Sequence, residues 1–163
     1  MFRNRGDMKI QPITPENRDL ANEILKREWG LPIVSRGKAH DGTKLPGFLS
    51  FSGGKISGLV TYNIDERGCE ITSLNSFEEN RGVGTALINA VSEAAKNSGC
   101  DRLWLVTTND ITHAIRFYQR RGFDWVATHI NSADEMRQLK PTIPLLGEDG
   151  IPIKHEIEFE MRI

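Results

Sequence analysis

Apolar residues recur along the chain at two spacings, and the changes of spacing mark the expected elements. Alternating or continuous apolar runs predict seven strands, over residues 8–12, 47–52, 55–65, 69–74, 103–106, 123–130 and 156–163. Apolar stripes at helical spacing predict four helices, over residues 15–29, 83–98, 111–121 and 133–139. Strands and helices that alternate in this way are typical of a layered domain of mixed α and β structure.

Turn signals place these elements relative to one another. Gly53-Gly54 and residues 66–68 stand between neighbouring strands, so the strands over residues 47–74 are expected to form an antiparallel meander. The strand–helix–strand order over residues 69–130 instead implies locally parallel strands. The predicted fold class is therefore α/β (α+β), with a mixed central sheet of about seven strands flanked by helices.

The ends of the elements carry their own signals. Thr14-Pro15 predicts the start of the first helix, with a capping hydroxyl before proline at the first helical position. Asn109 or Asp110 is the predicted cap of the third helix, which Gly122 ends. Residues 31–46 carry glycines and prolines among polar residues, which predicts a loop with room for one short helix.

Composition narrows the class of protein. The chain has 163 residues, of which 38% are hydrophobic and 26% charged, and its formal net charge is −1. We expect one soluble domain over residues 8–163 behind a polar N-terminal extension over residues 1–7. The absence of a basic excess argues against nucleic acid or a membrane surface as partner. The charged N-terminus is unlike a signal peptide, so we expect a cytoplasmic protein.

Cysteine and histidine spacing gives no sign of a metal or a disulfide framework. Cys69 and Cys100 form no CxxC pair, and we expect them to be small buried side chains in a reducing compartment. The histidines lack metal-ligand spacing and are scattered over His40, His113, His129 and His155. No metal is therefore expected.

Residues 79–84, Glu-Asn-Arg-Gly-Val-Gly, lie between a predicted strand and the longest predicted helix. Glycines let backbone amides approach a ligand, and a helix N-terminus adds unpaired N–H groups with a partial positive charge. The loop is either a phosphate cradle, with Arg81 as charge partner, or a tight turn without a ligand. A dinucleotide loop would need a third glycine where Leu87 stands, and the GxxxxGK[ST] string of a P-loop does not occur.

The loop and a second segment together resemble the motifs of the GNAT superfamily of acyltransferases. Residues 79–84 are similar to its pyrophosphate motif [QR]xxGx[GA], with Glu79 where the family usually has Gln or Arg. The family's Asn…A…FY…GF pattern is matched by Asn109, Ala114, Phe117-Tyr118 and Gly122-Phe123. The resemblance covers residues 8–130 and the last strand, and it implies a GNAT fold with acetyl-CoA as acyl donor and no metal.

The resemblance also implies which residues bind coenzyme A. They belong to the end of the family's fourth strand, the glycine loop, the helix start and the second motif, namely Leu74, Asn75, Ser76, Asn80, Arg81, Gly82, Val83, Gly84, Thr85, Asn109, Phe117 and Tyr118. We infer that backbone amides of residues 81–85 provide most of the binding and that Glu79 contributes its main chain.

Two residues are candidates for catalysis. Tyr118 takes the family's tyrosine position, which implies a contact with the departing thiolate, and the alternative is an aromatic pair with Phe117. Glu70 lies on the strand over residues 69–74, where relatives often carry a base, and Thr72 and Leu74 are expected on its face. The alternative for Glu70 is an exposed carboxylate, with bulk water as the base.

The acceptor is left open by the sequence. Trp29, Arg36 and His40 lie where relatives form a wall of the acceptor cleft, and Arg36 favours an anionic acceptor. A stripe of glutamates on the last strand, Glu156, Glu158 and Glu160, favours a cationic one. The alternative for the first group is packing and loop solvation, and for the stripe it is a solvated or helix-covered strand face. Some segments also resemble a group of small bacterial acetyltransferases whose acceptors are not assigned.

The sequence therefore predicts an acetyl-CoA-dependent N-acetyltransferase that moves an acetyl group directly to a primary amine of a small molecule or peptide in a ternary complex. The alternative from another class is a non-catalytic module that binds coenzyme A as a sensor or structural ligand. Relatives often pair through sheet edges or C-terminal strands, which implies a homodimer as the expected assembly.

Overall fold

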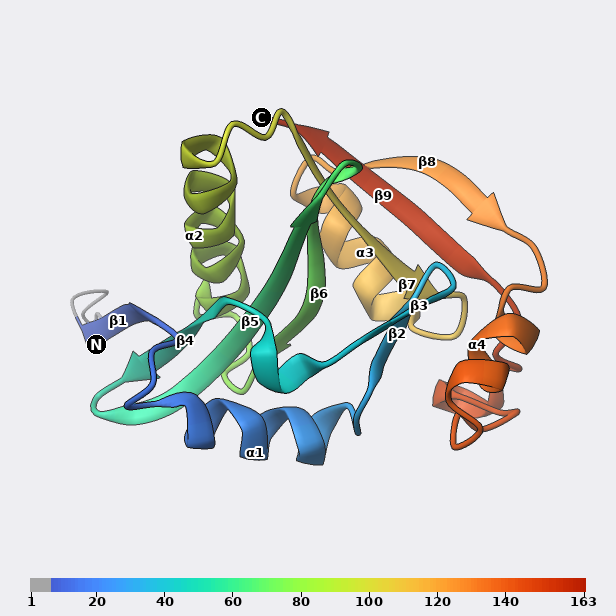
Figure 1. Cartoon of the computed structure of the whole chain (residues 1–163), viewed down its shortest axis with the longest axis horizontal. Helices are drawn as coiled ribbons and strands as arrows, with labels where there is room; N and C mark the ends of the chain where they lie inside the picture. Colours follow the sequence, from blue (N-terminus) through green and yellow to red (C-terminus); the bar gives the residue numbers. More distant parts are fainter. Residues whose placement is uncertain (1–6) are drawn as a thin grey trace.

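A seven-stranded sheet forms the centre of the computed structural model, which describes residues 7–163 (Figure 1). In spatial order the strands are β1 (Met8–Pro12), β4 (Gly47–Ser52), β5 (Lys55–Asp65), β6 (Gly68–Ser76), β7 (Arg102–Thr108), β9 (Glu156–Arg162) and β8 (Asp124–His129). Neighbouring strands are antiparallel except β6 and β7, so the predicted mixed sheet and the meander are confirmed. Apart from Asp7, the predicted N-terminal extension lies outside the described residues.

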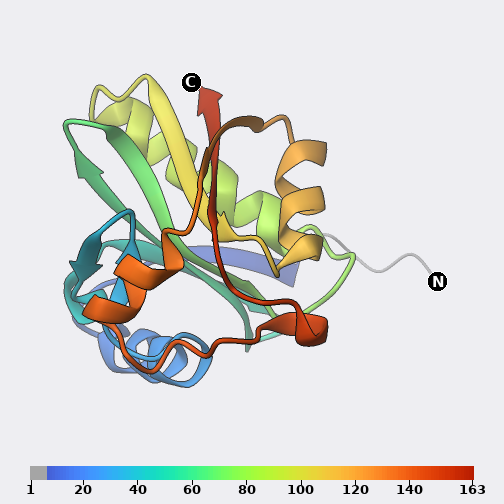
Figure 2. The same ribbon diagram turned by 90° about the vertical axis from the view of Figure 1, so that its right-hand side faces the viewer.

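Helices cover both faces of this sheet (Figure 2). One face carries α2 (Val83–Asn97) and α3 (Thr112–Arg120), and the other carries α1 (Arg18–Glu28) and α4 (Ala133–Leu139). Strand alternation divides the core between the two layers. Val60 of β5 packs into the cluster under α2, whereas its neighbour Leu59 packs into the cluster under α1.

Residues 31–46 form a hairpin rather than the predicted loop. Strands β2 (Ile33–Ser35) and β3 (Lys38–His40) make a separate two-stranded sheet. Arg36 and Gly37 join them with φ angles of +47° and +74°, the conformation of a two-residue hairpin turn. The expected short helix follows as a single 3₁₀ turn, η2 (Gly42–Lys44). A second one, η3 (Glu148–Gly150), lies before β9.

The predicted start of the first helix is wrong. Its expected cap, Thr14, donates its backbone N–H to Asn17 Oδ1 at 2.8 Å, and this bond closes residues 14–17 as a turn. Asn17 then occupies the N-cap position, and the helix begins at Arg18. The helix therefore starts three residues later than the proline signal indicated.

Strands β6 and β7 diverge soon after they meet. They pair only at Cys69–Leu103 and Glu70–Trp104, although both strands run on for several residues. A β-bulge lies directly beyond, because Tyr62 of β5 pairs with Ile71 and its neighbour Thr61 pairs with Ser73. Bulges bend a strand and increase its twist, so β6 leaves β7 here and a gap opens towards α1 and α4 (Figure 1).

The same bulge changes which side chains share a face. Thr72 is the extra residue, and it shifts the alternation of β6 by one position. Leu74 therefore packs with Ile71 in the cluster under α2, whereas Glu70 faces the β2–β3 hairpin. The prediction that Leu74 shares the face of Glu70 is wrong for this reason.

Candidate active site

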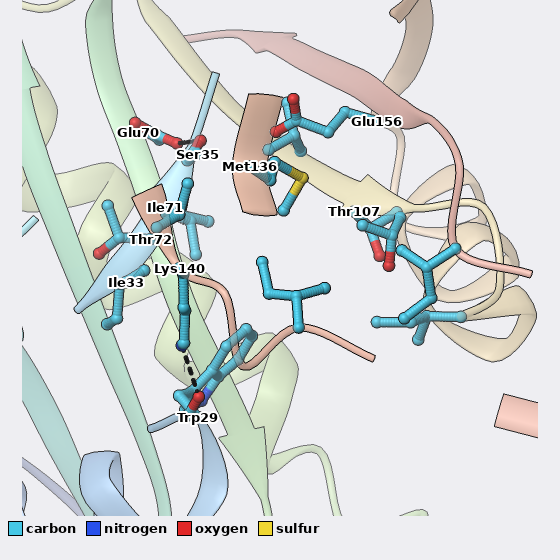
Figure 3. Close-up of a pocket in the computed structure, with 16 residues that line it drawn as sticks. Trp29, Ile33, Ser35, Glu70, Ile71, Thr72, Thr107, Met136, Lys140 and Glu156 are labelled. Atoms are coloured by element: carbon cyan, nitrogen blue, oxygen red, sulfur yellow. Dashed lines mark hydrogen bonds between the residues drawn. The ribbon is translucent and has the colours of Figure 1, made fainter. Parts of the chain in front are cut away.

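The gap between β6 and β7 leads into a pocket of about 200 Å³ on the α1 and α4 side of the sheet (Figure 3). The residues that line it come from segments far apart in the sequence, and are Trp29, Ile33, Val34, Ser35, Glu70, Ile71, Thr72, Val106, Thr107, Thr108, Ile111, Met136, Lys140, Ile143, Ile153 and Glu156. Most of these side chains are apolar. Of the two predicted catalytic residues, Glu70 lines this pocket and Tyr118 does not.

Glu70 is a buried carboxylate, 1% exposed, held by the β2–β3 hairpin. Its Oε2 accepts a hydrogen bond from Ser35 Oγ, and its Oε1 lies 3.5 Å from Nε2 of His40. In the described part of the chain, this Oε1 and this Nε2 have no hydrogen-bond partner. Arg67 Nη2 lies 4.0 Å from Oε1 and donates instead to Asp65 at 2.9 Å. The alternative of an exposed carboxylate is therefore wrong.

A second buried carboxylate, Glu156, lies across the pocket from Glu70 and already has a cationic partner (Figure 3). Its Oε2 accepts from the backbone N–H of Arg36 at 3.0 Å, and its Oε1 accepts from the guanidinium of Arg36 at 3.1 Å. The positive φ of Arg36 lets the turn direct both groups at one carboxylate. The charge that favoured an anionic acceptor is thus used within the protein.

The other glutamates of β9 are paired as well. Arg102 donates to Glu158 at 2.6 Å and also to Glu160, and His129 Nε2 lies 2.9 Å from Glu158. Burial raises the pKa of Glu158, but the hydrogen bonds with His129 and Arg102 outweigh it and leave the pKa below its ordinary value. Glu158 and Glu160 of the stripe therefore belong to an ion-pair network across β7, β8 and β9.

Lys140 and Trp29 close another wall of the pocket. Lys140 Nζ donates to the carbonyl oxygens of Trp29 at 2.8 Å and Gly30 at 3.1 Å, which ties the end of α4 to the end of α1. Burial lowers the pKa of Lys140. The indole of Trp29 donates to Asn75 Oδ1 at 2.6 Å. Asn75, predicted to bind coenzyme A, thus fixes this wall to the end of β6.

The N-terminus of α2 is open to a ligand. Gly82 is its N-cap residue with φ +75°, and within residues 7–163 no side chain caps it. Ala86 N–H bonds back to Gly82, so the preceding amides of residues 83–85 point out of the first turn. Asn80, Arg81 and Gly82 are exposed, and so is Glu79. These features fit the phosphate cradle that the glycine loop predicted.

Gly84 also serves the packing of α3 against α2. A Cβ at this position would lie 2.9 Å from the ring of Phe117, so the glycine lets α3 approach α2 closely. Arg121 covers the same ring, with its guanidinium carbon 3.5 Å from the ring centre, and donates to Thr85 Oγ1 at 3.0 Å. Arg121 is therefore a cation beside the first turn of α2 that the sequence analysis missed.

Tyr118 lies in the core on the α2 side of the sheet, 8% exposed. The rings of Phe117, Phe123 and Phe159 surround it at centroid distances of 5.1, 5.5 and 6.1 Å. Burial raises the pKa of its phenol, and Arg121 offsets only part of this rise. The aromatic pair with Phe117 is confirmed, and a contact with a thiolate stays a prediction.

Asn109 does not cap α3, so that prediction is wrong. Its Oδ1 accepts from the backbone N–H groups of Lys154 at 2.9 Å and His155 at 3.0 Å, and its Nδ2 donates to Pro152 at 2.9 Å. Asp110 does not cap α3 either, because Thr108 and the backbone of Glu148 engage its carboxylate, and Ile111 is the N-cap residue. Both residues hold the segment that precedes β9.

The described residues give no indication of a metal site or of a membrane helix. Among residues 7–163, no three His, Cys, Asp or Glu side chains are grouped to hold a metal ion. No helix over the same residues is long and apolar enough to cross a membrane.

Comparison with known proteins places this geometry in a family. The sequence model of the acetyltransferase (GNAT) family matches residues 11–123. The chain is 42% identical over 153 residues to the uncharacterized protein YdhI of Bacillus subtilis, which covers 90% of this chain and 95% of YdhI. The uncharacterized protein YxbD of the same organism is 37% identical over 153 residues, with 92% and 96% covered.

A solved structure shows the same fold. The GNAT family acetyltransferase from Elizabethkingia anophelis with acetyl-CoA bound is 22% identical and superposes with a TM-score of 0.68, covering 96% of this chain and 99% of that one. The family match and the fold agree with the predicted resemblance. The chain belongs to the acetyltransferase (GNAT) family and is an acyltransferase.

Proposed function

We propose that the protein is an acetyl-CoA-dependent N-acetyltransferase that moves the acetyl group to a primary amine by direct transfer in a ternary complex. One observation carries this proposal: the gap between β6 and β7 separates an open helix N-terminus from a pocket with a buried carboxylate. A donor and an acceptor that enter from the two sides would meet in the gap. The acetyl-CoA bound by the neighbour of the same fold supports the choice of donor.

The donor would be held mainly by main-chain groups. The amides of Val83, Gly84 and Thr85 provide hydrogen bonds for a diphosphate, and the helix dipole adds a partial positive charge. Arg121, bonded to Thr85, and the exposed Arg81 add full charges. Residues 74–76 of β6 pair with β5 on one edge but not with β7 on the other, so the main-chain groups on the β7 edge could bind an extended arm and donate to a developing oxyanion.

Glu70 would take a proton from the amine before attack. An ammonium group has no lone pair, and a carboxylate beside it accepts the proton that blocks the attack. Ser35 orients the carboxylate by its hydrogen bond, and His40 lies behind the other oxygen. The neutral nitrogen then forms the C–N bond as the C–S bond breaks. Its second proton leaves to water after bond formation, and the released thiolate takes up one proton from water to become a thiol.

Tyr118 would stabilise the departing thiolate as a hydrogen-bond donor. Because burial raises its pKa, the phenol keeps its proton and is a poor source of a complete proton transfer. A hydrogen bond to an anionic sulfur needs no transfer. The hydroxyl is therefore proposed to donate without ionising.

Direct transfer fits the state of the cysteines. Cys69 is buried, and burial raises the pKa of its thiol to about 12, so it carries almost no thiolate at neutral pH. An acyl carrier needs a reactive thiolate. The proposed route therefore has no covalent acyl-enzyme.

The test is release of free thiol from acetyl-CoA in the presence of a panel of amines, with wild type compared with Tyr118→Phe. The proposal predicts thiol release that depends on the amine and slows about 10-fold in the variant, the effect of one lost hydrogen bond to a charged group. Tight binding of acetyl-CoA without turnover of any amine would favour the coenzyme-binding sensor instead.

A further inference from the structure

The walls of the pocket beside Glu70 are apolar. Met136 and Ile153 are 8% and 9% exposed, and Ile33 is 3% exposed, so these walls are well packed. Trp29 is 38% exposed at the other end of the pocket and offers an aromatic surface (Figure 3). A volume of about 200 Å³ suits a small molecule or a single side chain.

Three ionisable residues line the pocket, and two of them are already engaged. Glu156 accepts hydrogen bonds from the backbone N–H and the guanidinium of Arg36. Lys140 donates from its ammonium group to two main-chain carbonyls. Glu70 differs, because within residues 7–163 only Ser35 donates a hydrogen bond to it, while His40 Nε2 and Arg67 Nη2 lie 3.5 Å and 4.0 Å from its Oε1 without donating to it. A buried carboxylate in this state gains most from one added cation.

We propose, on the basis of the proposed function, that the acceptor is a small primary monoamine carried on an apolar body, such as an arylalkyl or alkyl amine. Its ammonium group pairs with Glu70 and gives up a proton there, and its hydrocarbon part packs between Trp29, Met136 and Ile153. The pocket thus holds one positive charge at one end and excludes water from the rest.

The same features reject two related classes of amine. A carboxylate next to the amine, as in a free amino acid, would meet Glu70 and Glu156, and Arg36 is already paired with Glu156. A second ammonium group at the far end of a diamine would meet Trp29 and the ammonium group of Lys140, and the other pocket carboxylate, Glu156, is already paired with Arg36. Either charge would lose its hydration without compensation.

Two matched pairs of amines test this proposal. 2-Phenylethylamine and phenylalanine share one body and differ by a carboxylate, and hexylamine and 1,6-diaminohexane differ by a second amine. We expect kcat/KM to be at least about 10-fold higher for the first member of each pair, the usual scale for a single pocket contact. Equal or faster acetylation of phenylalanine or the diamine would overturn the proposal while leaving the enzyme an N-acetyltransferase.

A variant pair ties the selectivity to this pocket. Ile143→Lys places a cation in the wall, and we expect it to reduce the preference for 2-phenylethylamine over phenylalanine about 10-fold. Leu145→Lys makes the same change two residues along, at a side chain outside this pocket that is 73% exposed, and should leave the preference unchanged. An unchanged preference in Ile143→Lys, with the variant folded by circular dichroism, contradicts the proposal. Absence of turnover with every amine, despite measured acetyl-CoA binding, overturns it together with the proposed function.

Discussion

The two sides of the gap between β6 and β7 are built in different ways. The side with the α2 N-terminus uses main-chain groups that are close in sequence, at the end of β6 and over residues 80–85. The side with the pocket uses side chains from β2, β3, β6, α4 and β9. A main-chain site needs a local motif and little else, whereas a side-chain site depends on the whole fold. The first side is therefore proposed to bind the shared donor, and the second to choose the acceptor.

The largest effect is expected from a substitution that impairs the acceptor side and leaves the donor side intact. Glu70→Gln keeps the shape of the side chain but removes the base, and we expect kcat at pH 7 to fall about 100-fold or more. The KM for acetyl-CoA should stay within a factor of about 2, because donor binding does not involve this carboxylate. Steady-state kinetics with 2-phenylethylamine measure both values. Glu66→Gln, in an exposed turn nearby, is the control and should change neither.

The next largest effect is expected from a substitution that impairs donor binding and leaves the acceptor side intact. Gly82 has φ +75°, which a β-branched residue adopts only with strain, so Gly82→Val should disturb the first turn of α2. We expect the KM for acetyl-CoA to rise about 10-fold, as one or two hydrogen bonds to phosphate are lost. Gly99→Val provides the matched control at the other end of the same helix, where φ is +82°. A similar rise in KM for both variants would show that helix stability, rather than the cradle, is responsible.

A smaller effect tests whether the hairpin orients Glu70. Ser35→Ala removes the hydrogen bond to the carboxylate, and we expect kcat/KM for the amine to fall about 5- to 10-fold. Ser50→Ala, in a buried serine pair away from the pocket, is the comparison. Equal losses in both variants would assign Ser35 to packing.

The smallest effect concerns the stability of the strands that support the acceptor side, not the chemistry of that side. Because the folded-state pKa of Glu158 lies below its ordinary value, its ionised form stabilises the protein above pH 5, and this contribution is lost as the pH falls through the folded-state pKa. Glu158→Gln should therefore lower the free energy of unfolding by about 1 kcal/mol at pH 7 and by less near pH 3.5. Urea unfolding at the two pH values measures this. A penalty that grows on acidification would contradict the proposed pairing.

Local signals predicted the regular elements well. The Gly53-Gly54 turn predicted where β4 ends and β5 begins. The apolar stripe of α2, followed by Gly99, predicted where that helix ends. Both signals act between neighbours in sequence, where turn geometry and strand or helix period decide the structure. The glycine loop before α2 was predictable for the same reason.

On the pocket side, the sequence predicted that Glu70 and Trp29 lie near the acceptor, but it did not predict their contacts, because these join distant segments. Ser35 meets Glu70 across 35 positions, and Lys140 meets Gly30 across 110 positions. The strands of the hairpin are three residues long, too short for a periodic signal, although Arg36-Gly37 was a usable turn signal. Asn109 had the right type and place for a cap, but tertiary contacts with residues 152–155 took its side chain. The bulge at Thr72 left no mark on the pattern.

The most direct test of the account is a crystal structure of the protein with bound acetyl-CoA. We predict the diphosphate on the amides of Val83, Gly84 and Thr85, and the thioester between β6 and β7 with its acetyl group facing the Glu70 pocket. A diphosphate bound elsewhere, or a first turn of α2 occupied by the carboxylate of Glu79, would contradict it.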